Sequence, residues 1–76
     1  MLASSQHEIT ISGDNLLYWD HAVVEESALP QILGRLGARK ESVLIKADRR
    51  SSLGTLARVC DLARQKGLAS VHIATD

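Results

Sequence analysis

The 76-residue chain is poor in aromatic and sulfur-containing residues, with no phenylalanine and one residue each of tryptophan, tyrosine, cysteine and methionine. The single cysteine, Cys60, excludes an internal disulfide and a cysteine-rich zinc site, and its apolar surroundings favour a place in the core. Nine lysine and arginine residues balance nine acidic residues. Dedicated nucleic-acid-binding proteins carry a basic excess, so we expect no nucleic-acid partner.

Long apolar runs are also missing. No stretch approaches the ~20 apolar residues of a membrane-spanning helix, and the first eight residues lack the basic end and apolar centre of a signal peptide. We therefore assign residues 1–8 to a disordered or added leader and residues 9–76 to one folded domain. A domain this small buries only roughly 60% of its unfolded surface, so association with a second copy or a larger assembly is a natural source of stability.

Alternation of polar and apolar residues predicts the strands. Residues 8–12 place Ile9 and Ile11 on one face, and after a turn at 13–15 the run 16–20 returns with Leu17 and Trp19 towards the core. The opposite phase of this second run stays open, because Leu16 is also apolar. His21 and Ala22 are expected to form a short link, after which Val23 and Val24 continue extended. Two more short apolar runs, 43–47 and 71–75, complete a set of four predicted strands.

Apolar spacing predicts two helices. The first begins near Glu26 or Ser27, with Ser27 as its cap and Pro30 in its first turn, where a missing N–H costs little. The second runs from Leu53 to Lys66, is capped by Ser51 or Ser52, and stops at Gly67. The apolar face of the first helix is predicted to be Leu29, Ile32, Leu33 and Leu36. That of the second is predicted to be Leu53, Leu56, Ala57, Cys60 and Ala63, with Val59 and Leu62 widening it.

The predicted element order is therefore β-β-α-β-α-β. It indicates an α+β two-layer sandwich in which two helices cover one face of a four-stranded mixed sheet. The closing strand–helix–strand unit favours parallel strands. The opposite face of the sheet is half polar and is expected to carry Thr10, Tyr18, Lys46, His72 and Ala74.

No motif of a catalytic, cofactor or metal site is present. The three histidines, His7, His21 and His72, have no helical spacing that would bring two of them onto one metal. Glycine-rich phosphate loops, HExxH and a nucleophile elbow are absent. The charged run 48–50 follows a strand end, which is a favoured place for ligands, but it reads more simply as a loop in which Asp48 helps to cap the next helix. We predict a domain that is not an enzyme and has no cofactor.

The closing run 71–75 is the candidate binding element. It lacks proline, lysine and any bulge signal, which are the features that protect an exposed sheet edge. As an edge strand, it offers the backbone groups of Val71, Ile73 and Thr75 to a second copy or to a partner's extended segment. Its hydrophobicity equally fits a central strand, and the sequence leaves both positions open.

Residues 9–75 resemble the periplasmic domain of the ExbD/TolR family of biopolymer transport proteins. One part of the resemblance is the run ITISGDNLLYWDHAVV; another is a strand that ends in Ala47 and Asp48, followed by Gly54 at the opening of a helix. A closing strand then follows Gly67. The chain departs from the family pattern at three positions, with Asn15 and His21 where glycine is frequent and Leu53 where an aromatic is common.

The resemblance implies a non-catalytic periplasmic domain of a bacterial inner-membrane protein, with a transmembrane anchor upstream. Family members dimerise inside a ring of ExbB/TolQ-like subunits, are driven by the proton gradient, and transmit work to a TonB- or TolA-like protein for transport or envelope integrity. Some contact peptidoglycan. Two rival functions remain open from the residues alone: a ligand-binding regulatory domain, and an RNA-binding module that uses Arg49 and Arg50.

Overall fold

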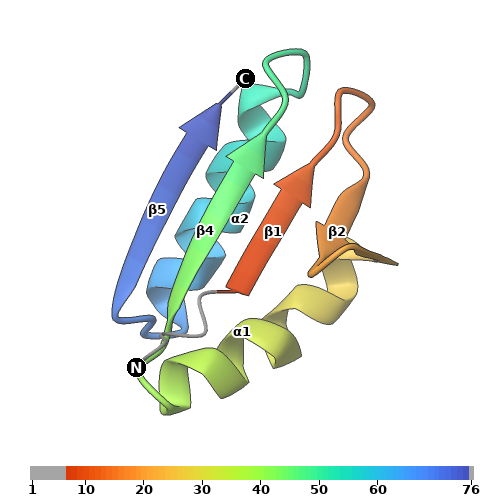
Figure 1. Cartoon of the computed structure of the whole chain (residues 1–76). Helices are drawn as coiled ribbons and strands as arrows, with labels where there is room; N and C mark the ends of the chain where they lie inside the picture. The colour runs from red at the N-terminus through yellow and green to blue at the C-terminus, as the bar shows by residue number, and fades with distance from the viewer. Residues whose placement is uncertain (1–6, 76) are drawn as a thin grey trace.

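The computed structural model describes residues 7–75 and contains one mixed sheet with helices packed against it (Figure 1). The sheet order is β3-β2-β1-β4-β5. Strand β1 pairs antiparallel with β2 and parallel with β4, and β5 pairs parallel with β4. In chain order the elements are β1 (His7–Ile11), β2 (Leu17–Trp19), β3 (Ala22–Val24), the 3-10 helix η1 (Glu26–Ala28), α1 (Leu29–Ala38), β4 (Ser42–Ala47), α2 (Leu53–Gln65) and β5 (Ser70–Thr75).

The prediction of four strands is wrong, because the described chain forms a five-stranded sheet. The missed strand is β3, which pairs antiparallel with β2 through Trp19 opposite Ala22. Asp20 and His21 make the two-residue turn between them with φ angles of 47° and 79°. Two-residue hairpin turns usually contain Asn-Gly or Asp-Gly. This turn has Asp-His instead, so the sequence carries no recognisable turn signal. His21 is therefore a turn residue and Ala22 the first residue of a strand, so the two do not form a link.

The boundary of the folded part also differs from the prediction. Strand β1 begins at His7, so residues 7 and 8, which we assigned to the leader, belong to the sheet. Residues 1–6 of that assignment lie outside the described residues.

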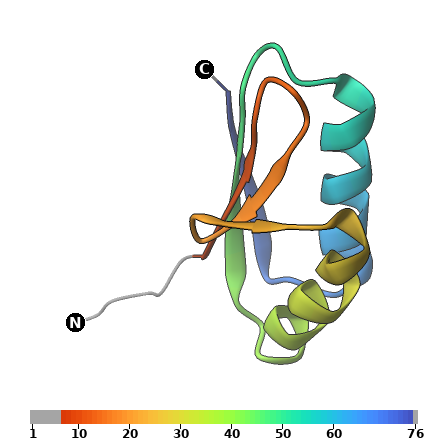
Figure 2. The ribbon, with the colours of Figure 1, turned by 90° about the vertical axis from the view of Figure 1, so that its right-hand side faces the viewer.

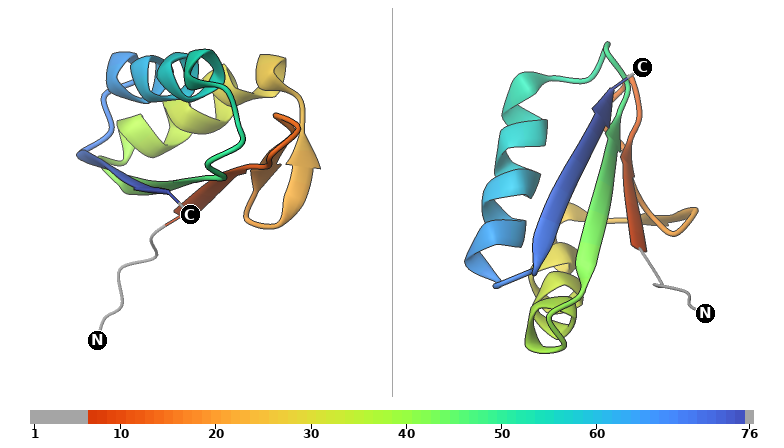
Figure 3. Two further views of the ribbon diagram at one scale, coloured as in Figure 1. Left: turned by 90° about the horizontal axis from the view of Figure 1, so that it is seen from above. Right: turned by 60° about the vertical axis from the view of Figure 1, so that its left-hand side comes forward.

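Both helices lie on the same side of the sheet (Figures 2 and 3). The alternation of β1 and β4 places Ile9, Ile11, Val43 and Ile45 beneath the helices, all with no exposed surface. Leu17 is buried and Trp19 packs against this core, as the sequence predicted. The other face of the sheet carries side chains that are partly or fully exposed. They lie in register across the strands and include Thr10, Tyr18, Lys46 and Ala74.

The apolar stripe of α1 is confirmed, because Leu29, Leu33 and Leu36 are buried. Its start differs from the prediction: residues 26–28 form η1, and no side chain, including that of Ser27, caps either helix segment. The predicted N-cap of α2 and the glycine that ends it are both confirmed. Ser52 Oγ accepts the Thr55 N–H at 3.1 Å, and Gly67 has a φ of 81°.

The predicted inner face of α2 is partly wrong. Its buried residues are Thr55, Val59, Cys60 and Ala63, so the stripe is centred on Val59. Leu53 is 82% exposed and Ala57 is also exposed. The 3.6-residue period leaves the exact centre of the stripe open, and packing of α2 against the sheet selects it.

Candidate partner-binding edge

Strand β5 forms one edge of the sheet. Its six residues pair with β4 on one side, and no other strand among residues 7–75 pairs with its outer side. The question that the sequence left open is therefore decided in favour of an edge position. A strand at a sheet edge exposes a row of unpaired N–H and C=O groups, which is a template for an added strand.

The three residues that the sequence singled out differ in exposure. In the register of β4 and β5, Val71, Ile73 and Thr75 lie beside Val43, Ile45 and Ala47, on the face that carries the helices. Val71 packs against the core, Ile73 is 47% exposed, and Thr75 is exposed. The neighbour of Ile73 in β4, Ile45, has no exposed surface. The helices therefore cover the inner face of β4 fully at this level but leave the neighbouring side chain of β5 half exposed. Ile73 presents an apolar side chain at the open edge.

The opposite edge of the sheet is β3, and it is much shorter. It has three residues, of which Val23 is 64% exposed. Short edge strands are one way in which proteins avoid unwanted strand addition. Of the two edges, β5 offers the longer run of backbone groups.

A small polar cluster joins the beginnings of β4 and β5. Ser42 Oγ and Ser70 Oγ lie 2.7 Å apart, and Ser70 Oγ lies 3.2 Å from His72 Nε2. The serine–histidine contact lies on an exposed strand, and neither hydroxyl nor ring has an acidic partner among the described hydrogen bonds. This geometry fixes the register of two parallel strands and gives no support for nucleophilic catalysis.

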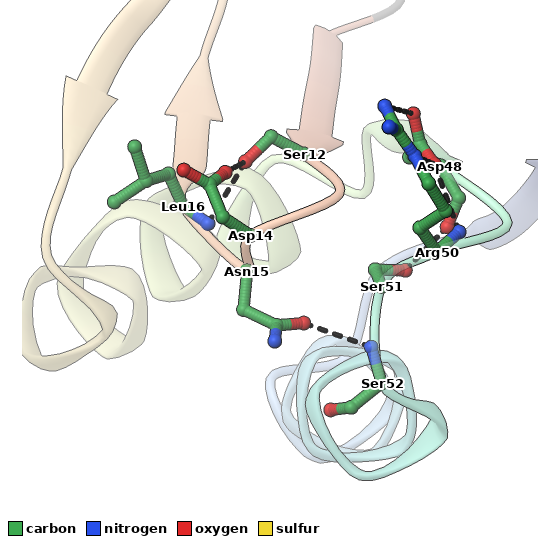
Figure 4. A network of polar contacts seen from close by, with 8 residues as sticks. All are labelled: Ser12, Asp14, Asn15, Leu16, Asp48, Arg50, Ser51 and Ser52. Carbon is green, nitrogen blue, oxygen red and sulfur yellow. Dashed lines mark hydrogen bonds and ion pairs between the residues drawn. The ribbon is translucent and has the colours of Figure 1, made fainter.

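The charged loop after β4 is largely satisfied by its own groups (Figure 4). Asp48 Oδ1 accepts the Arg50 N–H at 2.8 Å and the Arg50 side chain at 3.2 Å. The Arg50 guanidinium lowers the pKa of the Asp48 carboxyl. The expectation that Asp48 caps α2 is wrong, since Ser52 does so. A hollow of about 710 Å³ lies between this loop and the β1–β2 turn, lined by Thr10, Ile11, Ser12, Gly13, Asp14, Lys46, Asp48 and Arg50.

Sequence reasoning missed a cluster at the other end of β1. His7 Nδ1 lies 3.0 Å from Asp20 Oδ2, and His7 Nε2 lies 3.0 Å from Glu41 Oε1. The ring stacks on Trp19 with centroids 5.0 Å apart. The three polar residues are separated by 13 and 34 positions in sequence, so no local signal connects them. Among residues 7–75, no group of three or more His, Cys, Asp or Glu side chains has a metal-binding arrangement.

Comparison with known families decides where the chain belongs. The family model described as "Biopolymer transport protein ExbD/TolR" matches residues 1–76, the whole sequence. The chain belongs to the ExbD/TolR family. A search of curated proteins gives no match to it.

Membership of the ExbD/TolR family places the chain in a membrane-associated, non-enzymatic group of biopolymer transport proteins. The family is generally associated with ExbB/TolQ and TonB/TolA partners. In the part of the chain that the structure describes, neither helix has the length and apolar character needed to cross a membrane. The open β5 edge is the feature of this ExbD/TolR domain that fits a binding role.

Proposed function

We propose that this ExbD/TolR domain is a non-catalytic, periplasmic binding module of a proton-motive-force-driven motor subunit, and that it acts by strand addition at β5. The supporting observation is the open outer side of a six-residue edge strand without proline or lysine. A second copy of the chain is the first proposed occupant. A TonB- or TolA-like segment is the partner to which work passes, and ExbB/TolQ-like subunits are engaged through the full-length, membrane-anchored protein.

Symmetry restricts the form of a β5-to-β5 dimer. Most homodimers have a two-fold axis, and such an axis between edge strands makes them antiparallel. The two sheets then continue into one another with their helices on the same side. Side chains opposite each other in an antiparallel pair share a face, so odd-numbered residues must oppose odd-numbered residues. A register centred on Ile73 places its exposed side chain against Ile73 of the second copy.

Hydrogen exchange and association measurements on the same samples test this proposal. We expect the amides of residues 70–75 to gain protection as protein concentration rises, together with a shift to dimer in sedimentation velocity. Ile73→Lys places a charge at the open edge and should abolish both effects, because like charges would meet across the pair. Val23→Lys makes the same change at an exposed position of the other edge and should leave both effects intact.

A separate arm of the experiment tests the motor partner. A synthetic extended peptide from a TonB- or TolA-like protein should protect the same amides and should compete with dimer formation, since one edge accepts one strand. A chain that stays monomeric, with β5 exchange unchanged by concentration and by peptide, would remove strand addition from the proposal.

Peptidoglycan is a second proposed contact, and the hollow between the β1–β2 turn and the β4–α2 loop favours it. Lys46 and Arg50 bring positive charge to the hollow, and Asp14 and Asp48 bring negative charge. Peptidoglycan stems carry both carboxylates and amines and can match this mixture. Purified sacculi should retain the chain, and Lys46→Gln should weaken retention in a salt-dependent way while β5 exchange stays unchanged. Retention that is insensitive to Lys46→Gln would exclude this hollow.

A further inference from the structure

The cluster around His7 joins two connections that are distant in sequence. Asp20 belongs to the turn between β2 and β3, and Glu41 lies directly before β4. His7, the first residue of β1, lies between them with one ring nitrogen 3.0 Å from each carboxylate. Trp19 supports one face of the ring, nearly parallel to it at 14°. The ring is therefore held by two parts of the chain that are distant in sequence, Trp19 with Asp20 on one side and Glu41 on the other.

The number of N–H donors on the ring decides whether both carboxylates can be hydrogen-bonded. A neutral imidazole has one N–H donor and one lone-pair nitrogen, whereas an ionised carboxylate only accepts hydrogen bonds. Two ionised carboxylates on the two ring nitrogens can both be satisfied only by the imidazolium, which has two N–H donors. A neutral ring would direct a lone pair at one of the carboxylates.

We propose that His7, Asp20 and Glu41 form a proton-operated latch, in which the charged ring ties the β2–β3 turn to the α1–β4 connection and loss of its proton releases Glu41. The proposal rests on the two contacts and on the donor count, and it is independent of strand addition at β5.

Glu41 is the arm that opens, because Asp20 has other attachments. Asp20 Oδ1 accepts the Glu8 N–H at 3.0 Å, and the Asp20 N–H donates to the Glu8 carbonyl at 3.0 Å. Besides the ring, the Glu41 carboxylate has only Arg39 Nη1 nearby in the described structure, at 3.9 Å, and Arg39 is well exposed. The neutral ring therefore keeps its single donor for Asp20.

The charges around His7 also favour the protonated ring. The hydrogen bond that the Asp20 carboxylate accepts from the His7 ring has the largest effect on the pKa of His7. Together with the contacts to Glu41 it outweighs partial burial, so the pKa of His7 is raised above 6.5. Partial burial raises the pKa of Asp20, but the Glu8 N–H and the His7 ring outweigh it and leave that pKa lowered. The other charged or titratable groups are Arg39, beside Glu41, and His21, which acts on Asp20.

These directions define a pH window for the latch. A histidine whose pKa is raised by folding contributes stability that is complete below about 6.5, its unfolded value, and is lost as the pH rises through the folded value. Asp20 contributes above about 3.9 and loses its contribution as the pH falls through its lowered value. With both carboxylates ionised, the latch is therefore fully closed below about pH 6.5 and opens as the pH rises through the folded pKa of His7.

Release of Glu41 can affect the rest of the sheet, because the backbone of Glu41 is hydrogen-bonded to two other elements. The Glu41 carbonyl accepts the Ala69 N–H at 3.0 Å, and Ala69 directly precedes β5. The Glu41 N–H in turn donates to the Leu36 carbonyl near the end of α1, at 2.9 Å. The connection that the latch holds is thus bonded both to the last turn of α1 and to the start of β5.

Nuclear magnetic resonance of the full chain tests the latch without any substitution. We expect both ring nitrogens of His7 to be protonated below its midpoint, that midpoint to lie above 6.5, and the Glu41 carboxyl carbon to shift with the same midpoint. The protection factor of the Ala69 amide, which is its exchange rate corrected for the base-catalysed intrinsic rate, should fall over the same pH range. A His7 midpoint at or below 6.5, or a Glu41 signal that does not follow His7, would overturn the proposal.

Variants separate the latch from general electrostatics. Glu41→Gln should lower the His7 midpoint while leaving its contact with Asp20. His7→Gln should remove the change in the Ala69 protection factor between pH 5 and 8. His72→Gln is the matched control, because it removes an exposed histidine that faces no carboxylate in the described hydrogen bonds. The proposal fails if His72→Gln removes the change in the Ala69 protection factor as effectively as His7→Gln.

Discussion

The side-chain oxygen of Asn15 accepts the backbone N–H of Ser52 at 2.8 Å, across 37 positions of sequence (Figure 4). Ser52 is the N-cap of α2, and the first N–H groups of a helix have no partner within it. The tip of the first hairpin therefore fixes the start of the second helix. Asn15 has a φ of 66°, a conformation that asparagine tolerates better than most residues.

Substitutions of Asn15 should separate its two contributions. Asn15→Gly keeps the backbone conformation and loses the hydrogen bond, so we expect a loss of about 1 kcal/mol of unfolding free energy. Asn15→Ala also strains the backbone and should cost about 1 kcal/mol more. Asn15→Asp keeps an acceptor and should remain close to the wild type. Urea unfolding checks the order, and equal stability of the alanine and glycine variants would contradict the backbone contribution.

Two glycines of α1 should respond in opposite ways to the same substitution. A Cβ at Gly34 meets nothing within 4 Å, so Gly34→Ala should stabilise the chain by about 0.5–1 kcal/mol through helix propensity. A Cβ at Gly37 would lie 1.7 Å from the Lys66 carbonyl oxygen, where α1 and α2 end side by side. Gly37→Ala must push the two helix ends apart, and we expect a loss of about 2 kcal/mol or more. Thermal unfolding of both variants checks the contrast.

The ion pair between Glu26 and Arg58 should give part of the acid sensitivity of the chain. Arg58 Nε lies 2.9 Å from Glu26 Oε2, and the Arg58 guanidinium lowers the pKa of the Glu26 carboxyl. A lowered carboxyl pKa stabilises the fold above its unfolded value of about 4.3, and this contribution is lost as the pH falls through the folded value. Glu26→Gln should therefore reduce the difference in unfolding free energy between pH 7 and 3. The change is small because both groups are largely exposed.

The proposed dimer predicts which cysteine substitution forms an intermolecular disulfide. Opposed residues of an antiparallel pair have Cα atoms roughly 4.5–5.5 Å apart, within disulfide range. Ile73→Cys should therefore give a covalent dimer on a non-reducing gel under mild oxidation. Val23→Cys, at an exposed site of the β3 edge, should stay monomeric, and the buried native Cys60 should not interfere. Equal cross-linking at both sites would indicate random collision.

Local patterns predicted most elements and the phases of several. The alternation around Ile9 and Ile11, the stripe of α1, the Ser52 cap and the Gly67 stop are all confirmed. Each depends on residues within about one helical turn or one strand, where backbone geometry imposes a fixed period. The family resemblance also followed from the order of these elements, and the family model confirms it.

The misses have physical reasons of their own. Strand β3 has three residues, too few for a period to show, and its turn uses Asp20 and His21 instead of glycine. Leu53 reads as an inner residue of an amphipathic helix, yet it is the first residue of α2 and is 82% exposed. The candidate edge was half predicted, because the composition of β5 fits an edge and a central strand equally well.

The sequence by itself determined four of the five strands, both α-helices, the glycine stop of α2 and the family that the chain resembles, because these depend on short-range backbone and side-chain preferences. Only the tertiary structure decided that β5 is an edge, that Asn15 reaches Ser52, and that His7 lies between Asp20 and Glu41. Strand order and helix crossing set these relationships, since they bring together residues whose separation in sequence carries no information about their distance in space.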